Sequence, residues 1–206
     1  MKEMYNNYKK ELSKKNSLII IVMVIFLIGI IFGSIYITIL SNDQKSIIVK
    51  QVGEYFKNMP KVTFEDKLEI FKNSLISNLL YTTSIWILGL SIVGLPIIFI
   101  MLFFKSFILG FSVSSIFAKY DIKGLLKAII YVLPANLITI ILTIVLASYS
   151  ILISCKLFSC AFKKQTINFK TFMGKYLFLL VISILICILC SLYEAFINPF
   201  FYKIIY

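Results

Sequence analysis

Long apolar blocks separated by short polar segments run along this chain, and their lengths predict membrane-spanning helices. The first block, Leu18–Leu40, contains 23 residues and no charge. At about 1.5 Å per residue it covers the roughly 30 Å hydrocarbon core of a bilayer. Residues 73–118 form a longer block of 46 residues with a single charge, at Lys105. As one helix this block would reach about 69 Å, so we expect it to fold back on itself.

Turn-forming residues give the position of this reversal. They cluster once within the block, at Gly89, Ser91, Gly94 and Pro96. A tight hairpin at this cluster leaves two spans, at about 73–90 and 94–117, each long enough to cross a bilayer.

The apolar block that ends at Cys155 allows two registers around Pro134. It holds 28 uncharged residues, and the proline could kink one long helix or lie in the first turn of a span at about 134–155. The second register fits the bilayer better and leaves Gly124–Leu133 as a short amphipathic segment at the interface. With a last span at about 176–197, the predicted fold is an all-α, polytopic integral membrane protein. It has about five transmembrane helices and forms one membrane domain.

The polar segment between the first two spans, residues 41–72, is the only sizeable stretch suited to water. Its acidic and basic side chains nearly balance, and an amphipathic stretch, Ile47–Met59, precedes Pro60. Thr63–Asp66 has the pattern of a capping box, which predicts that a helix begins near Thr63 and continues into the second span. Apolar residues recur at helical spacing near its start and are candidates for contact with a partner protein: Phe64, Leu68 and Phe71.

The distribution of lysine predicts the orientation in the membrane. The segment 156–175 carries five lysines and no acid, and the tail before residue 17 carries five lysines and two acids. The positive-inside rule places both segments in the cytoplasm, which requires an even number of crossings between them. Four crossings satisfy the rule and independently support the split of block 73–118. The loop 41–72 and the C-terminus then lie outside the cytoplasm.

Composition narrows the class of protein further. Hydrophobic residues make up 60% of the chain and the mean hydropathy is +0.97, far above the roughly 45–50% apolar content of soluble domains. The net charge of +12 comes from lysine alone, since the sequence has no arginine and no histidine. Lysines that flank apolar blocks fit anchoring at a membrane surface, whereas nucleic-acid binding favours arginine in a soluble domain. Membrane lipids are therefore expected partners, and nucleic acid is not.

The sequence lacks the residue sets of common enzymes. Without histidine, Ser-His-Asp and Cys-His triads and His-bearing metal sites lose a necessary member. No pair of carboxylates lies within a span, and a Gly-rich phosphate loop is missing. We interpret the four cysteines as small apolar fillers. These are Cys155, Cys160, Cys187 and Cys190. We expect a protein that is not an enzyme and needs no cofactor or metal.

Four residues within the predicted spans are candidates for function or packing. Lys105 lies near mid-membrane, where an ionisable group is costly and usually has a partner. It could contact an ion or substrate, pair with Asn136 or Glu194, or snorkel from a local helix break. Gly110 begins a stripe of small residues spaced by four, which favours close packing within the chain over a dimer contact. Pro134 marks the second irregular position, close to Asn136.

The stretch from Gly89 to Asn136 resembles the stage II sporulation protein M family of endospore-forming bacteria. The resemblance rests on the glycine and proline hairpin and on two segments. Lys105–Ser112 looks like the family's Asn-Gly and Gly stretch, and Gly124 to Asn136 looks like its Pro-His stretch. The family pattern often has histidine after the proline and glutamate soon after, whereas this chain has Ala135 and Asn136. The predicted order of elements, one span, an outer loop and four more spans, also resembles the family and covers nearly the whole chain.

The resemblance implies a non-catalytic scaffold or anchor in the mother-cell membrane. The similar family member holds two cell-wall hydrolases, stage II sporulation proteins D and P, at the septal membrane during engulfment. Segment 41–72 and the faces of the spans would then make the contacts to partners. The all-lysine basic set, with abundant isoleucine and asparagine, also indicates an AT-rich genome of clostridial type.

A second class of function is a small membrane transporter or permease subunit. The irregular positions Lys105, Pro134 and Asn136 motivate it, and it predicts a solvated cavity that reaches the lysine. About five spans with few polar lining groups argue against a transporter that acts alone.

Overall fold

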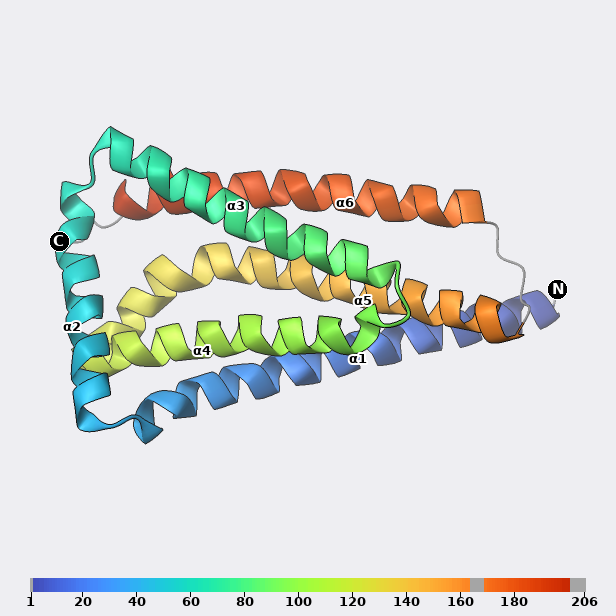
Figure 1. The fold of residues 1–206 in the computed structure, drawn as a ribbon, viewed down its shortest axis with the longest axis horizontal. Helices are drawn as coiled ribbons and strands as arrows, with labels where there is room; N and C mark the ends of the chain where they lie inside the picture. The colour runs from blue at the N-terminus through green and yellow to red at the C-terminus, as the bar shows by residue number, and fades with distance from the viewer. Residues whose placement is uncertain (1, 164–168, 201–206) are drawn as a thin grey trace.

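The computed structural model describes residues 2–163 and 169–200, and every element within these ranges is a helix or a helical turn (Figure 1). In chain order they are α1 (Lys2–Ile39), α2 (Asn42–Asn58), the 3₁₀ turn η1 (Met59–Lys61), α3 (Phe64–Gly89), α4 (Gly94–Lys127), the π-helical turn η2 (Ala128–Val132), α5 (Leu133–Lys163), α6 (Phe169–Leu192) and the π-helical turn η3 (Tyr193–Ile197). The all-α class predicted from the sequence is confirmed.

Five long helices form a bundle, and α2 crosses one end of it (Figure 1). The start of α1 and the turn between α3 and α4 lie at the opposite end. The helices α1, α4 and α6 run toward the α2 end, while α3 and α5 run away from it. The chain therefore crosses the length of the bundle in alternating directions.

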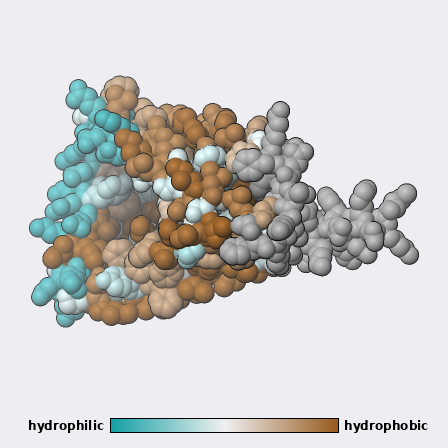
Figure 2. Space-filling view, turned by 45° about the vertical axis from the view of Figure 1, so that its right-hand side comes forward, coloured by the Kyte–Doolittle hydropathy of each residue, from teal (hydrophilic) through white to brown (hydrophobic). Residues whose placement is uncertain are grey.

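The described residues contain three stretches that are long and apolar enough to cross a membrane, which is fewer than the five spans predicted. They are Ser17–Ile39, Gly94–Cys160 and Met173–Phe200. The second stretch has 67 residues and holds both α4 and α5, which run in opposite directions. α3 is not among the three, because polar side chains recur along it. Figure 2 shows hydrophilic side chains gathered at the α2 end and a hydrophobic surface over the middle of the bundle.

Segments predicted as loops or tails are largely helical. α1 begins well before residue 18, and α5 and α6 extend into the predicted inner loop 156–175 from both sides. Between them, residues 164–168 lie outside the described residues. The predicted outer loop 41–72 consists of α2, η1 and the first turns of α3. Apolar length alone missed this helicity, because lysine and glutamate in the flanks are good helix formers as well.

Both helices of the outer segment begin with a capping box. At the start of α2, the Ser41 hydroxyl accepts a hydrogen bond from the Gln44 amide at 3.4 Å, and the Gln44 side chain accepts one from the Ser41 amide at 3.3 Å. At the start of α3, Thr63 Oγ1 accepts from the Asp66 amide at 3.3 Å, and the Asp66 carboxylate accepts from the Thr63 amide at 2.8 Å. The predicted helix start at Thr63 is confirmed, and this capping satisfies backbone donors that a helix start leaves free.

Acidification should loosen the first turn of α3. The hydrogen bonds from Thr63 hold the pKa of the exposed Asp66 carboxyl below its ordinary value. A carboxyl with a lowered pKa stabilises the folded state above its unfolded pKa of about 4, and this contribution is lost as the pH falls through the lower folded value. We expect faster hydrogen exchange of the Asp66 amide below about pH 4, after correction for the intrinsic rate. In Asp66→Asn this acid-dependent opening should disappear; its persistence would assign the effect to another group.

α4 bends near its end at Asp121, where φ is 52° and ψ is −135°. A positive φ is strained for a residue with a side chain. The bend separates a long segment, 94–120, from a short one, 122–127, that leads into η2. The short segment and η2 together occupy the predicted interfacial segment Gly124–Leu133.

Pro134 is the second residue of α5, and η2 continues into α5 without a break in the helical backbone. The proline therefore lies within a longer helical segment, which is closer to the first predicted register than to the second. Proline has no backbone N–H, so the carbonyl four residues earlier, at Ile130, loses its helical donor. Two side-chain amides bond the next two carbonyls of the same turn. Asn136 Nδ2 donates to the Val132 carbonyl at 2.7 Å, and Asn198 Nδ2 donates to the Tyr131 carbonyl at 3.0 Å. Asn136 therefore has a local structural role beside the proline, and Asn198 ties the end of η3 to η2.

The most extensive helix–helix packing joins α1 to α4. Gly29 and Gly33 of α1 face the backbone of α4, and Gly110 of α4 faces the Ile30 carbonyl of α1. The Ser34 hydroxyl donates to the Gly110 carbonyl at 3.3 Å. Small residues thus allow the two backbones to approach closely, which is a common basis of helix association in membranes. The structure places Gly110 in a contact within the chain.

An aromatic cluster holds α2 across the end of the bundle. The Phe56 ring is only 2% exposed, and its centroid lies 5.8 Å from those of Tyr120 and Tyr131. The buried ammonium of Lys127 lies 3.7 Å from the Tyr120 centroid and 5.2 Å from the Phe56 centroid, within range of cation–π attraction. α2 therefore packs on α4 and η2 and leaves its opposite face exposed.

Candidate functional site

Polar side chains from α4, α3 and η3 form one connected network inside the bundle. Lys105 Nζ donates to Asn78 Oδ1 at 3.4 Å, and Asn78 Nδ2 donates to Ser74 Oγ at 3.3 Å. The Ser74 hydroxyl donates to the Glu194 carboxylate. Every link therefore points the same way, from a cation on α4 to an anion on η3, with two neutral side chains of α3 between them.

The direct contacts of Lys105 differ from the predicted partners, Asn136 and Glu194. Within the part of the chain that the structure describes, Lys105 makes no hydrogen bond to Asn136, and it reaches Glu194 only through the side chains of α3. Its direct contacts are Asn78 and the face of the Tyr81 ring, whose centroid lies 4.8 Å from Nζ. Neither Asn78 nor Tyr81 of α3 was among the predicted site residues. The signal was a stripe of polar residues spaced by four, Ser74, Asn78 and Thr82.

Buried sulfur and hydroxyl groups of α6 border the network. Ser191 Oγ lies 3.1 Å from Ser74 Oγ, and Cys187 Sγ lies 3.4 Å from Thr82 Oγ1. Cys190 is buried nearby, while Cys155 and Cys160 belong to α5. Within the described ranges, no group of three His, Cys, Asp or Glu side chains could hold a metal ion.

The chemistry of the network suits helix positioning. A lysine and a glutamate in an apolar bundle are stabilised when their hydrogen bonds are satisfied, and removal of one link leaves the charge uncompensated. The side-chain amide of Asn78 donates on one side and accepts on the other, but it does not titrate near neutral pH, so it is a poor link for proton transfer. The network therefore fixes α3, α4 and η3 relative to one another.

A half-open cavity of about 420 Å³, here called the Lys105 groove, lies between α3, α4 and the start of α5. Its apolar rim includes Phe104 and Ile108, which are 57% and 60% exposed. The groove brings Lys105 and Asn136 to one surface, although these two side chains are not hydrogen-bonded to each other. Its polar wall consists of Ser77, Tyr81, Lys105, Ser112 and Asn136.

The predicted partner-contact residues lie at the α2 end, in the first turns of α3. Phe64 is 65% exposed and Leu68 is 46% exposed, whereas Phe71 is half-buried. The Phe64 ring also packs near Phe196 of η3, with 6.3 Å between centroids. We call the surface formed by α2 and the start of α3, residues 42–71, the outer platform.

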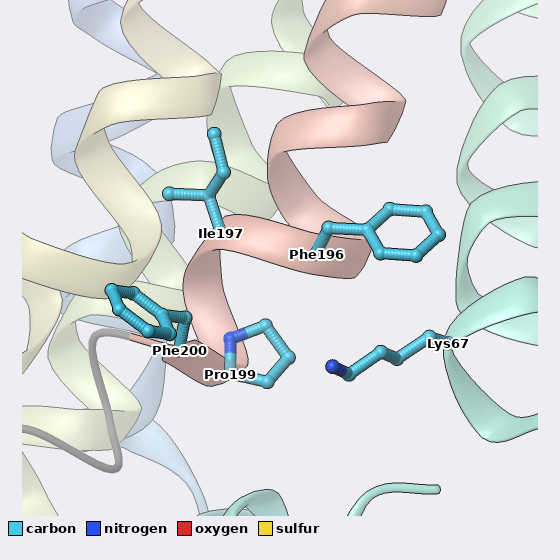
Figure 3. Close-up of a pocket in the computed structure, with 5 residues that line it drawn as sticks. All are labelled: Lys67, Phe196, Ile197, Pro199 and Phe200. Carbon is cyan, nitrogen blue, oxygen red and sulfur yellow. The ribbon is translucent and has the colours of Figure 1, made fainter. Parts of the chain in front are cut away.

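A small cavity of about 210 Å³ separates the start of α3 from the end of the chain's last described helix. Figure 3 shows Lys67 extending from α3 toward Phe196 and Pro199, with Ile197 and Phe200 on the far side. Lys67 Nζ lies 6.0 Å from the Phe196 centroid. These contacts join the outer platform to the end of the bundle.

Apolar helices that fit a membrane and a polar network that positions them define an all-helical membrane protein. The family model of stage II sporulation protein M matches residues 22–199. The chain therefore belongs to the stage II sporulation protein M family, as the resemblance indicated. No curated protein and no solved structure matches it.

Proposed function

We propose that this chain is a non-catalytic membrane scaffold in endospore formation, which helps to assemble or localise peptidoglycan hydrolases at the septal membrane during engulfment. Family membership supports a sporulation-related membrane protein. The observation that carries the scaffold role is the outer platform, a braced helical surface across one end of the bundle with exposed apolar side chains.

The proposed topology has five crossings, made by α1, α3, α4, α5 and α6. The alternating directions of these helices support it (Figure 1). The lysine-rich N-terminal segment and residues 156–175 then belong to the cytoplasmic side, because basic loops stay in the cytoplasm. The outer platform and the C-terminus then face the side opposite the cytoplasm. The membrane that holds the chain is the mother-cell membrane during sporulation.

In this topology the outer platform faces the compartment in which peptidoglycan is cleaved. Wall hydrolases such as stage II sporulation proteins D and P would meet it there. Exposed aromatic and aliphatic side chains among charged ones are typical of contact surfaces between proteins. On the platform these are Ile47, Tyr55, Phe64 and Leu68, which are 46% to 65% exposed.

Charge placed on the platform should release the hydrolases. In the double variant Phe64→Asp and Leu68→Asp, we expect recovery of co-purified stage II sporulation proteins D and P from sporulating cells to fall about tenfold or more, as for central contact residues of an interface. The matched control is Ile122→Asp. Ile122 is 76% exposed and lies in α4 directly after the bend at Asp121, outside the platform.

Equal recovery from the double variant and from Ile122→Asp would remove the platform as the contact. Neither change touches a buried side chain, so both variants should reach the membrane in normal amounts. Absence of both hydrolases from the preparation of the unaltered chain would contradict the proposed function itself.

A further inference from the structure

Lys105 has more hydrogen-bond donors than its own bundle uses. A lysine ammonium carries three N–H groups. Among the described residues, one donates to Asn78 and the cation faces the Tyr81 ring. The side chain lines the Lys105 groove, with Ser77 and Asn136 as further polar groups on the same wall. Donors without acceptors are costly in hydrocarbon, so an occupant with an oxygen acceptor would be stabilised there.

The depth of the lysine decides which molecule can supply that oxygen. Lys105 follows Gly94, the first residue of α4, by eleven positions, which is about 17 Å along the helix. In the proposed topology this is near the middle of the roughly 30 Å hydrocarbon core. Lipid headgroups stay at the interface, and acyl chains carry no acceptor at this depth. A protein side chain on a transmembrane helix can present one.

The shape of the groove fits the edge of a helix. Its volume of about 420 Å³ holds several side chains of one helix face, and the exposed rim residues Phe104 and Ile108 add apolar packing surface. Glu194 already brings a negative charge to the network through Ser74, so the acceptor on the partner can be an amide as well as a carboxyl oxygen.

A second copy of this chain is a poor occupant through α1 or α6. The exposed side chains of α1 between residues 20 and 35, and of α6 between residues 177 and 192, are hydrophobic. These outer faces therefore present apolar side chains at the depth of Lys105, where an acceptor is needed.

We propose that the Lys105 groove is the docking site for a transmembrane helix of another membrane protein, which presents a side-chain oxygen of Asp, Glu, Asn or Gln to Lys105 Nζ. This inference rests on the proposed scaffold function. It adds an intramembrane contact to the one made at the outer platform.

Photo-crosslinking in sporulating cells tests the proposal with the full chain. A benzophenone amino acid replaces Phe104 at the groove rim, and the matched control carries it at Phe178 of α6, a phenylalanine that is 68% exposed. We expect light-dependent adducts from position 104, mapped by mass spectrometry to a transmembrane helix with one of the four acceptor residues, and none to that helix from position 178. Lys105→Met should lower the adduct about tenfold, as loss of one buried hydrogen bond to a charged group does.

Replacement of the captured helix's polar residue by leucine should lower the adduct equally, and this second arm leaves the present chain unaltered if Lys105→Met fails to fold. Adducts with lipid alone, with a second copy, or with a helix lacking an acceptor residue would overturn the proposal, as would an adduct insensitive to both changes. If the hydrolases co-purify with the chain but position 104 captures no helix, the groove is refuted as a docking site and the scaffold function stands. If position 104 captures a helix with an acceptor residue but no hydrolase co-purifies, the scaffold function is refuted and the docking site stands.

Discussion

Gly110→Leu is expected to separate α1 from α4 and to remove most of the folded protein. A side chain built on Gly110 meets the Ile30 carbonyl, with the carbonyl carbon at 2.9 Å and Cα at 3.0 Å from the new Cβ. These are backbone atoms that cannot rotate away. Overpacking of a core costs about 1–3 kcal/mol, and we expect a loss at or above about 3 kcal/mol here because the largest helix contact of the bundle is forced open. The measurement is the thermal midpoint in detergent, with the monodisperse fraction as a second readout.

Gly174→Leu is the matched control for this prediction. Gly174 lies in α6, and a Cβ at this position meets nothing within 4 Å. Leucine also has a higher helix propensity than glycine, so the thermal midpoint should stay unchanged or rise slightly. An equal loss in both variants would show that glycine matters for helix insertion in general and not for the contact of α1 with α4.

Asn78→Leu should be the most damaging change in the polar network. It removes the hydrogen-bond acceptor of Lys105 and the donor to Ser74 at once. Loss of a partner from a buried charge costs about 3–5 kcal/mol, so we expect the free energy of unfolding to fall by about 3 kcal/mol. The added change Lys105→Met should restore part of that loss, because the stranded charge is then absent.

The test is a double-mutant cycle on unfolding in detergent. A coupling energy of about 1 kcal/mol or more between positions 78 and 105 supports the network. Asn73→Leu is the control, since Asn73 is an exposed asparagine of the same helix, and it should change stability little. Strictly additive effects of Asn78→Leu and Lys105→Met would mean that the two residues act separately.

Much of the fold could be predicted from the sequence, because the dominant signal is apolar length. It gave the all-α class and the reversal between α3 and α4. The number of spans is the weakest of these predictions. α3 carries polar residues such as Asn78 and Thr82, so its composition alone does not mark it as a membrane helix.

The partner of each helix could not be predicted. The sequence did not indicate which helix packs against Gly29 and Gly33 of α1. The packing partner depends on how the helices cross and not on their order in the chain. α2 could be predicted as amphipathic, but its path across the bundle depends on the cluster of Phe56, Tyr120 and Lys127, which joins α2 to the end of α4.

The candidate site, too, could be predicted only in part from the sequence. Lys105 was visible because one charge interrupts a long apolar block. The residues that connect it to Glu194, Asn78 and Ser74, are uncharged and of a kind that is common in helices, and only the packing of α3 on α4 and η3 selects them. Asn136 was noticed beside Pro134, and the structure shows its side-chain amide bonded to the Val132 carbonyl in the preceding turn.

The pairing of α1 with α4 also bears on how the chain is made. Ser34 and Gly110 are 76 residues apart, and α2 and α3 are synthesised between them. During translation α1 leaves the ribosome first and has no permanent neighbour until α4 follows. The largest contact of the bundle therefore closes late, and a chain interrupted before α4 exposes the glycine face of α1 to the quality-control proteases of the cell.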